Sequence, residues 1–307
     1  MATGKIYNFM GVRKLALAFS LILMLISIGS LAVNGLKFGL DFTGGSLVEI
    51  GYEQPADLEQ VRSSLQTAGF QDVTVQTFGS PRDVLIRLQA DHDPKLGDKV
   101  LQALEDGSNQ NLELRRNEFV GSQVGEELRE QGGLGMLLAL FMIMVYLAFR
   151  FQFKFSIGAV VALVHDVLVV LGFFSLLQVE FDLTVLAAIL AVIGYSLNDT
   201  IVVYDRIREN FRVLRKGDAA EVMNTSLSQT LSRTLMTSIT TLLVLVALFY
   251  FGGEMIHGFA MALLVGVLIG TYSSIYVAAN ALLMMNVTRE DLLPPQKEEG
   301  EEGEELP

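Results

Sequence analysis

Long apolar runs alternate with polar stretches along the 307-residue chain. Six runs can be distinguished, approximately Leu15 to Val33, Leu134 to Phe149, Phe155 to Leu177, Leu183 to Tyr204, Thr234 to Gly252 and Phe259 to Met285. A helix needs about 20 mostly apolar residues to cross a hydrocarbon core of roughly 30 Å. The pattern therefore predicts an α-helical polytopic membrane protein with six transmembrane helices.

The long polar stretch between the first two runs has the alternation of a folded domain. Its predicted elements are a strand at Ser46 to Tyr52, a helix at Ala56 to Ala68, strands at Val73 to Phe78 and Val84 to Leu88, a helix at Leu96 to Leu104 and a strand at Leu112 to Arg116. The order βαββαβ is typical of a ferredoxin-like sheet with two helices on one face. We expect a small α+β extracytoplasmic domain between helices 1 and 2.

Charged flanks predict the orientation of the spans. The basic residues that flank the apolar runs all fall on one side of the membrane: Lys5, Arg13, Lys14, Arg150, Lys154, Arg206, Arg208, Arg212, Arg215 and Lys216. The two short links on the other side carry Glu180 and Asp182, and Glu254 and His257, but no Lys or Arg. By the positive-inside rule, both termini are cytoplasmic and the α+β domain lies outside.

These features divide the chain into five parts. Residues 1–14 are a cytoplasmic N-terminus, 15–35 the first transmembrane helix, 36–132 a periplasmic α+β domain with its linker, 133–286 helices 2–6, and 287–307 an acidic, disordered cytoplasmic tail. The first run resembles a cleavable signal around Ser30-Leu31-Ala32. It is longer than a signal core of about 7 to 15 residues, so we expect an uncleaved anchor.

Composition excludes several classes of function. With 51% hydrophobic residues and a mean hydropathy of +0.45, a soluble enzyme is not expected. The chain has no Cys and three His, which excludes disulfides, thiolate-metal sites and a multi-histidine metal cluster. It has no P-loop and no dinucleotide fingerprint. We therefore expect no enzymatic activity, no cofactor, no bound metal and no nucleic-acid partner.

The fourth apolar run carries a carboxylate, Asp199, next to Asn198. A charged side chain at the centre of a membrane helix costs at least about 2.5 to 3.5 kcal/mol, so such a group usually serves ions, protons or helix pairing. Asp199 lies roughly 7 Å inside the cytoplasmic boundary at 1.5 Å rise per residue, and Ser196 shares its helical face. A carboxylate that only pairs or snorkels is the structural alternative.

Arg233, at the start of the fifth run, lies at a depth comparable to that of Asp199. Thr237 continues its helical face, so a permanent cation and hydroxyl groups form one stripe. This placement permits an ion pair with Asp199. The alternative is an arginine that only anchors the helix at the cytoplasmic surface.

His165 and Asp166 fall near the centre of the third run, where an unpaired ionisable group is most expensive. A proton relay needs titratable groups at more than one depth, and this pair together with Asp199 supplies them. A helix-helix hydrogen bond is the alternative for His165.

The last run repeats small residues every four positions: Gly258, Ala262, Gly266, Gly270, Ser274 and Ala278. Such a stripe lets a neighbouring helix approach closely. We interpret it as a packing seam.

Four motifs resemble those of the SecF family, the smaller subunit of the bacterial SecDF complex in the resistance-nodulation-division superfamily. They are GLDFTGGSLVEI (Gly39 to Ile50), VGSQVGEEL (Val120 to Leu128), HDV (His165 to Val167) and IGYSLNDTIVVYDRIREN (Ile193 to Asn210). The resemblance implies a multi-pass protein of the bacterial inner membrane that pairs with SecD beside the SecYEG channel, with SecA and YajC as further partners. It also implies that proton flow assists translocation of a preprotein, in contact with membrane lipid.

The same resemblance implies roles for individual residues. Asp199, within Asn198-Asp199-Thr200, and Arg233 match the family's proton-transport aspartate and arginine. Asp166 matches a family motif whose role is less clearly assigned. Two other functions stay open at this point: a small-molecule or lipid exporter of the same superfamily, and a scaffold that conducts no protons. The compact outer domain and the single set of six spans argue against the exporter.

Overall fold

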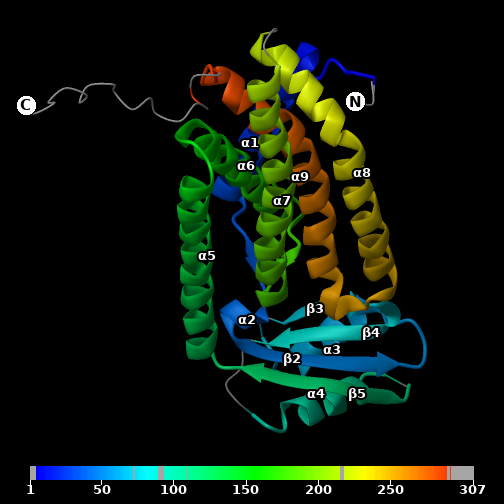
Figure 1. Ribbon diagram of the computed structural model, residues 1–307. Helices are drawn as coiled ribbons and strands as arrows, with labels where there is room; N and C mark the ends of the chain where they lie inside the picture. The colour runs from blue at the N-terminus through cyan, green and yellow to red at the C-terminus, as the bar shows by residue number, and fades with distance from the viewer. Residues whose placement is uncertain are drawn as a thin grey trace, which may run out of the picture.

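The computed structural model describes residues 5–71, 73–88, 93–108, 110–214, 218–288 and 291. Among these residues, six helices are long and apolar enough to cross a membrane, which confirms the six predicted spans. They are α1 (Arg13–Val33, preceded by the 3₁₀ turn η1, Met10–Val12), α5 (Ser122–Arg150), α6 (Phe153–Leu177), α7 (Leu183–Val213), α8 (Ala219–Phe251) and α9 (His257–Met284). The helices form a bundle with a sheet-containing domain at one end (Figure 1).

Several helices continue beyond their apolar runs. Helix α5 begins at Ser122, in polar sequence, and α7 continues to Val213. Once a helix is nucleated, each added residue gains a backbone hydrogen bond, so polar flanks extend it readily. Side-chain caps mark the beginnings of α7 and α8: Asp182 accepts the Val185 N–H at 2.8 Å, and Asp218 accepts the Glu221 N–H at 2.8 Å.

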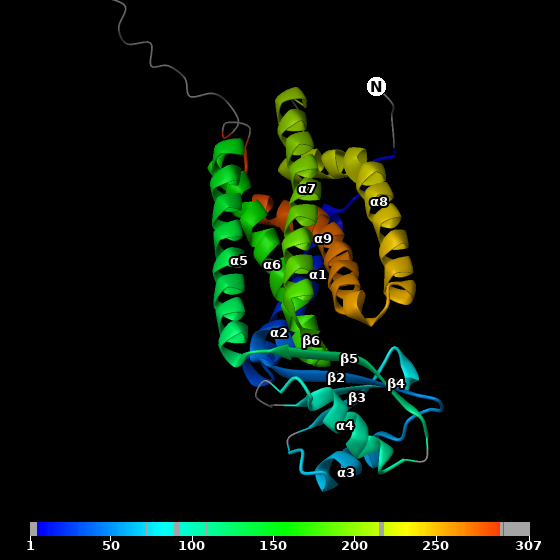
Figure 2. The same cartoon turned by 90° about the horizontal axis from the view of Figure 1, so that it is seen from below.

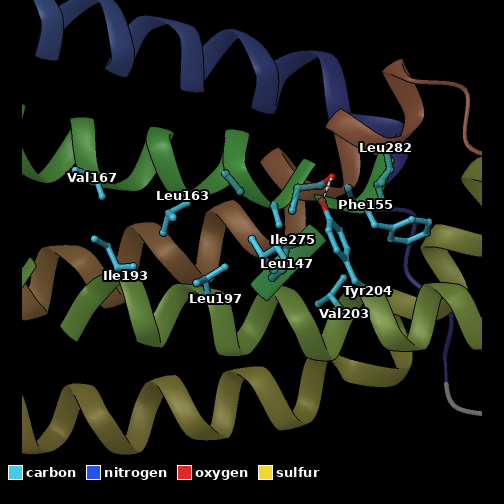
Figure 3. Packing of buried hydrophobic residues seen from close by; sticks show 14 of the residues in the cluster. Leu147, Phe155, Leu163, Val167, Ile193, Leu197, Val203, Tyr204, Ile275 and Leu282 are labelled. Atoms are coloured by element: carbon cyan, nitrogen blue, oxygen red, sulfur yellow. Dashed lines mark hydrogen bonds between the residues drawn. The ribbon is translucent and has the colours of Figure 1, made fainter. Parts of the chain in front are cut away.

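The centre of the bundle is made by α6, α7 and α9. About half of the apolar stretch of α6 and of α7 is buried (56% each), compared with 6% for α5 and 17% for α1 and for α8. Phe155, Leu163, Ile193, Tyr204 and Leu282 interlock at this centre (Figure 3). Helices α5 and α8 stand at opposite edges of the bundle, so their outer faces are available to lipid or to another protein (Figures 1 and 2).

The small-residue seam of α9 packs against α7. A Cβ atom at Gly266 would overlap the Val192 side chain, and one at Gly270 would lie 3.1 Å from the Cβ of Ser196. The two helices therefore touch with almost no side chain between them on the α9 side. This arrangement agrees with the packing role expected from the four-residue repeat.

The domain at the end of the bundle contains a four-stranded antiparallel sheet. Its strands are β2 (Gly45–Tyr52), β3 (Thr74–Phe78), β4 (Ser80–Leu88) and β5 (Leu112–Val120), in the spatial order β3-β4-β2-β5. Helices α3 (Leu58–Thr67) and α4 (Leu96–Glu105) cover the face turned away from the membrane helices (Figure 2). Their side chains and those of the strands form a separate apolar core that includes Ile50, Leu65, Ile86 and Val100.

Two strands are longer than the alternation predicts. β4 begins at Ser80 rather than Val84, and β5 ends at Val120 rather than Arg116. The reason is pairing: β2 extends to Gly45, which lies opposite Val120, so the ladder continues past the amphipathic part of β5.

Three short elements join the domain to the bundle and are absent from the sequence prediction. β1 (Lys37–Phe38) pairs in parallel with β6 (Glu180–Phe181), and helix α2 (Leu40–Thr43) follows β1. Arg87 on β4 and Lys37 on β1 both form ion pairs with Glu180, the latter at 3.5 Å. The short helix α2 is followed by Gly44.

Gly44 and Gly45 occupy positive φ angles of 69° and 122° at this junction. A Cβ at Gly44 would lie 2.6 Å from the Cα of Ser122, so only glycine fits where α2 meets α5. Gly44 and Gly45 therefore form a glycine joint between the sheet domain and the bundle. The acidic tail predicted over 287–307 lies outside the described residues apart from residues 287, 288 and 291.

Candidate functional site

Asp199 is a buried carboxylate in the middle of the bundle. It lies on α7 with 3% of its surface exposed. Within the described part of the chain, its Oδ2 atom has no hydrogen-bond partner although it is buried. A buried polar atom without a partner is expensive, and such atoms gather at functional sites rather than at sites of pure packing.

Arg233 lies within electrostatic range of Asp199 but forms no direct ion pair with it among the residues that the structure describes. Its side chain is exposed on α8, and so is that of Thr237. The Thr237 hydroxyl donates to the carbonyl oxygens of Arg233 (3.0 Å) and Thr234 (2.9 Å) on its own helix. The predicted stripe of Arg233 and Thr237 thus exists, but it faces outward in this chain.

The buried face of α8 carries other hydroxyl groups, which sequence reasoning did not single out. Thr234 is 2% exposed, and its Oγ1 is buried without a partner in the described residues. One turn further along, Ser238 shares a 2.7 Å hydrogen bond with Thr271 of α9 and receives one from Tyr195 of α7 at 3.4 Å. The spacing of these residues can be read from the sequence, but it does not distinguish the inner face of α8 from its outer face.

Asp166 is fully buried and is satisfied by three helices. Ser196 of α7 and Ser273 of α9 both donate hydroxyl hydrogen bonds to Oδ2, the second at 2.9 Å. Nδ1 of His165 lies 2.9 Å from Oδ1 on the same helix, α6. Nε2 of His165 is buried without a partner among the described residues. The structure therefore brings the predicted pair His165 and Asp166 together with the predicted Ser196.

Ser196 lies between the two carboxylates. It binds Asp166 and precedes Asp199 by one helical turn, or roughly 4.5 Å of rise along α7. The three residues form a buried polar cluster on α6 and α7. Ser273 completes this cluster and was missed by sequence reasoning, although the polar triplet Tyr272-Ser273-Ser274 inside an apolar run was a usable signal.

The two remaining predicted polar residues differ from each other. Thr200 is buried at 1% exposure, whereas Asn198 is exposed and lies beside Gly194, which has open space around it. The Asn198 side of α7 therefore faces out of this chain, as does the Arg233 side of α8. The Asn198 face of α7 and the Arg233 face of α8 are therefore available for contact with lipid or with another protein.

Fold and site together define a class: a polytopic membrane protein whose packed helices enclose ionisable groups linked by hydroxyls. Comparison with known proteins narrows this class. The profile of the C-terminal region of the protein export membrane proteins SecD/SecF matches residues 100–288, and the SecD/SecF GG motif matches residues 29–56. The second match includes the glycine joint described above.

Whole-chain relatives agree with the profiles. Protein translocase subunit SecF of Pseudomonas aeruginosa is 59% identical over 94% of both chains. The subunits of the same name from Vibrio alginolyticus and Escherichia coli O157:H7 are 53% and 45% identical, each over 99% of this chain and over 98% and 94% of the relative. The chain belongs to the SecF family of protein translocase subunits.

Two solved structures share the fold. The crystal structure of SecDF, a translocon-associated membrane protein from Thermus thermophilus, has a TM-score of 0.85 at 36% identity. The crystal structure of SecDF in a super-membrane-facing form has a TM-score of 0.70 at 37% identity. Each match covers 93% of this chain and 39% of the SecDF chain, so this chain spans less than half of those proteins.

Proposed function

We propose that this chain is the SecF-type subunit of a SecDF complex that uses proton movement across the bacterial inner membrane to assist protein translocation through the Sec channel. The observation that carries the proposal is the placement of two buried carboxyl groups, Asp166 on α6 and Asp199 on α7, with Ser196 bound to the first and one helical turn from the second. Such a pair provides successive positions for a proton at different depths.

Asp199 is the proposed exchange group, because one of its oxygens is buried without a hydrogen-bond partner among the described residues. A proton can bind there without displacing another donor. Arg233 on α8 places a permanent positive charge within electrostatic range of this carboxyl group.

Asp166 is the proposed second position. Its two serine donors stabilise the carboxylate, and the neighbouring His165 retains a ring nitrogen with no partner in the described residues. Protonation of either group would change the hydrogen bonds that join α6 to α7 and α9. Proton uptake would thereby alter the packing of three helices, which is how a local charge change becomes a mechanical one.

The proposed orientation places both termini in the cytoplasm and the sheet domain in the periplasm. Basic residues support it: Arg13, Lys14, Arg150, Lys154 and Arg206 all lie at helix ends remote from the sheet domain (Figure 1). We assign the sheet domain to the ferredoxin-like class. The strand order β3-β4-β2-β5 supports this assignment, as do the connections along the chain, in which α3 links β2 to β3 and α4 links β4 to β5.

SecD is the proposed direct partner. The outer polar faces at Asn198 and at Arg233 and Thr237 are unusual for a lipid-facing surface, which supports contact with a second protein. This chain matches 39% of the SecDF chain, and we assign the rest of that assembly to SecD. By family resemblance, SecYEG, SecA, YajC and the translocating preprotein are further partners. The proposed function requires no enzyme chemistry, metal or cofactor.

The test is Asp199→Asn in proteoliposomes that contain SecD, the Sec channel and an imposed proton gradient. The variant keeps the shape of the side chain but cannot carry a proton, so we expect SecD to co-purify while gradient-dependent stimulation of translocation disappears. Asp205→Asn, which makes the same chemical change at an exposed carboxylate of the same helix, is the matched control. Full stimulation with Asp199→Asn would exclude Asp199 from the proton route, whereas loss of membrane accumulation of the variant would favour the scaffold function.

A further inference from the structure

A cavity of about 530 Å³ lies at the end of the bundle remote from the sheet. Its walls come from the beginnings of α1 and α8 and from the end of α9, with Arg13, Lys14, Asp218, Asn280 and Thr288 among the polar lining residues. These segments meet near the N-terminus of the chain (Figure 1). None of the residues discussed for proton movement lines it.

The walls change from polar to apolar with depth. In α1 the cations Arg13 and Lys14 stand in the first turn, and Leu17 lies one turn deeper toward the bilayer. At the end of α9, Asn286 and Thr288 lie outside Met284, which is 70% exposed. This gradient matches a phospholipid, whose charged headgroup lies at the boundary and whose acyl chains lie against apolar helix surfaces.

The two cations are available to a ligand. Both side chains are exposed, and neither Arg13 nor Lys14 has an ion-pair partner in the described part of the chain. The acidic lining residue is Asp218, and its Oδ1 already accepts the Glu221 N–H. The lining therefore carries a net positive charge at the level where α1 enters its apolar run.

The opposite wall is held rigidly. Lys154 of α6 donates to the carbonyl oxygen of Asn286 at 3.2 Å and to Asp291 at 2.7 Å, and Asp291 accepts the Thr288 N–H at 2.8 Å. On the other side, Asn280 donates to the carbonyl oxygen of Arg13 at 3.3 Å. These bonds keep α1 and the end of α9 at a defined separation, so the cavity is built by the fold.

We propose that this cavity binds the phosphodiester headgroup of an anionic phospholipid, with Arg13 and Lys14 as its cationic contacts and the exposed apolar faces of α1 and α9 as acyl-chain contacts. Basic pockets between membrane helices at the headgroup level are suited to such lipids. The site adds a lipid requirement to the protein that is independent of the proton route. Bound lipid would hold the first span against α8 and α9.

The test is native mass spectrometry of the full-length chain, alone and with SecD, during titration with phosphatidylglycerol or phosphatidylcholine. We expect the protein to retain phosphatidylglycerol selectively. The double variant Arg13→Gln/Lys14→Gln should bind phosphatidylglycerol about 30-fold more weakly, which corresponds to roughly fivefold for each cation removed. Lys5→Gln/Arg206→Gln removes the same charge from the same end of the protein outside the cavity and should retain the selectivity.

Ala220→Leu keeps both cations but fills the cavity, so it should also weaken retention. Wild-type affinity in Ala220→Leu, or an equal loss in the Lys5 and Arg206 control, would show general surface attraction and overturn the site. Displacement of the lipid by inorganic phosphate at equal concentration would identify a free-phosphate site instead. Retention that disappears when SecD is present would assign the cavity to a protein partner and would also overturn the proposal.

Discussion

Ser196 on α7 donates its hydroxyl hydrogen bond to Asp166 on α6, and it lies one helical turn from the second buried carboxylate, Asp199. This relationship places two acidic groups that are 33 positions apart in sequence on either side of one serine. Ser196 is therefore the residue whose change tests whether the two carboxylates act together.

Ser196→Ala should lower gradient-dependent translocation several-fold while SecD still co-purifies. The alanine removes the donor to Asp166 and leaves a buried carboxylate with one hydrogen bond fewer, at a stability loss of about 1 to 3 kcal/mol. Ser196→Thr retains the hydroxyl and should keep most of the activity. Ser274→Ala is the matched control, because this buried serine donates only to Thr271 of its own helix. Activity of Ser196→Ala equal to that of the control would remove Ser196 from the route.

Gly266→Ala should destabilise the protein by about 1 to 3 kcal/mol, since the added methyl group overlaps Val192 and forces α7 and α9 apart. Thermal unfolding in detergent measures this loss. Gly194→Ala, at a position with open space, should leave the midpoint temperature of thermal unfolding unchanged or raise it slightly. Val192→Ala combined with Gly266→Ala should recover part of the loss. Absence of recovery would mean that another contact limits the approach.

Arg87→Gln should loosen the sheet domain on the bundle. Arg87 and Glu180 form a partly buried ion pair between β4 and β6, beside the strand pair that joins the two parts of the protein. Hydrogen exchange at residues 37–39 and 180–181 should become several-fold faster. Arg62→Gln, which breaks an exposed pair with Glu59 on α3, should leave this exchange unaltered. Equal exchange in both variants would show that the strand pair alone holds the junction.

Tyr52 should make the sheet domain sensitive to alkaline pH. Burial raises the pKa of its phenol to about 12 in the folded protein, from about 10 in the unfolded chain. The folded state therefore holds the proton more tightly, and this stability is complete below pH 10 and is lost as the pH rises toward 12, by up to about 2 kcal/mol. Tyr52→Phe should lack this loss, whereas Tyr7→Phe should behave like the unmodified chain. Tyrosinate absorbance, recorded together with unfolding, provides the measurement; absorbance that completes near pH 10 would contradict the prediction.

Much of the fold follows from local pattern. Six apolar runs become six helices because a helix in lipid must satisfy its own backbone hydrogen bonds. The strand pair β1 and β6 was not predictable, because Lys37 meets Glu180 only after the domain docks on the bundle. The outward orientation of the Arg233 side chain also could not be predicted from the sequence. Hydroxyl residues occur both on the face that proves to be buried (Thr234 and Ser238) and on the exposed one (Thr237), so the sequence offered no contrast between an inner and an outer face.

By itself, the sequence determined the number of spans, the position of each ionisable group along its helix and the membership of a family, because periodicity and motif order are properties of a single chain segment. Only the tertiary structure decided that Ser273 joins Asp166, that Asp199 keeps an unpartnered oxygen among the described residues and that Thr234 rather than Thr237 faces inward. The physical reason is that contacts between helices depend on which faces pack. In this protein, for example, the absence of a side chain at Gly266 lets α7 and α9 approach closely.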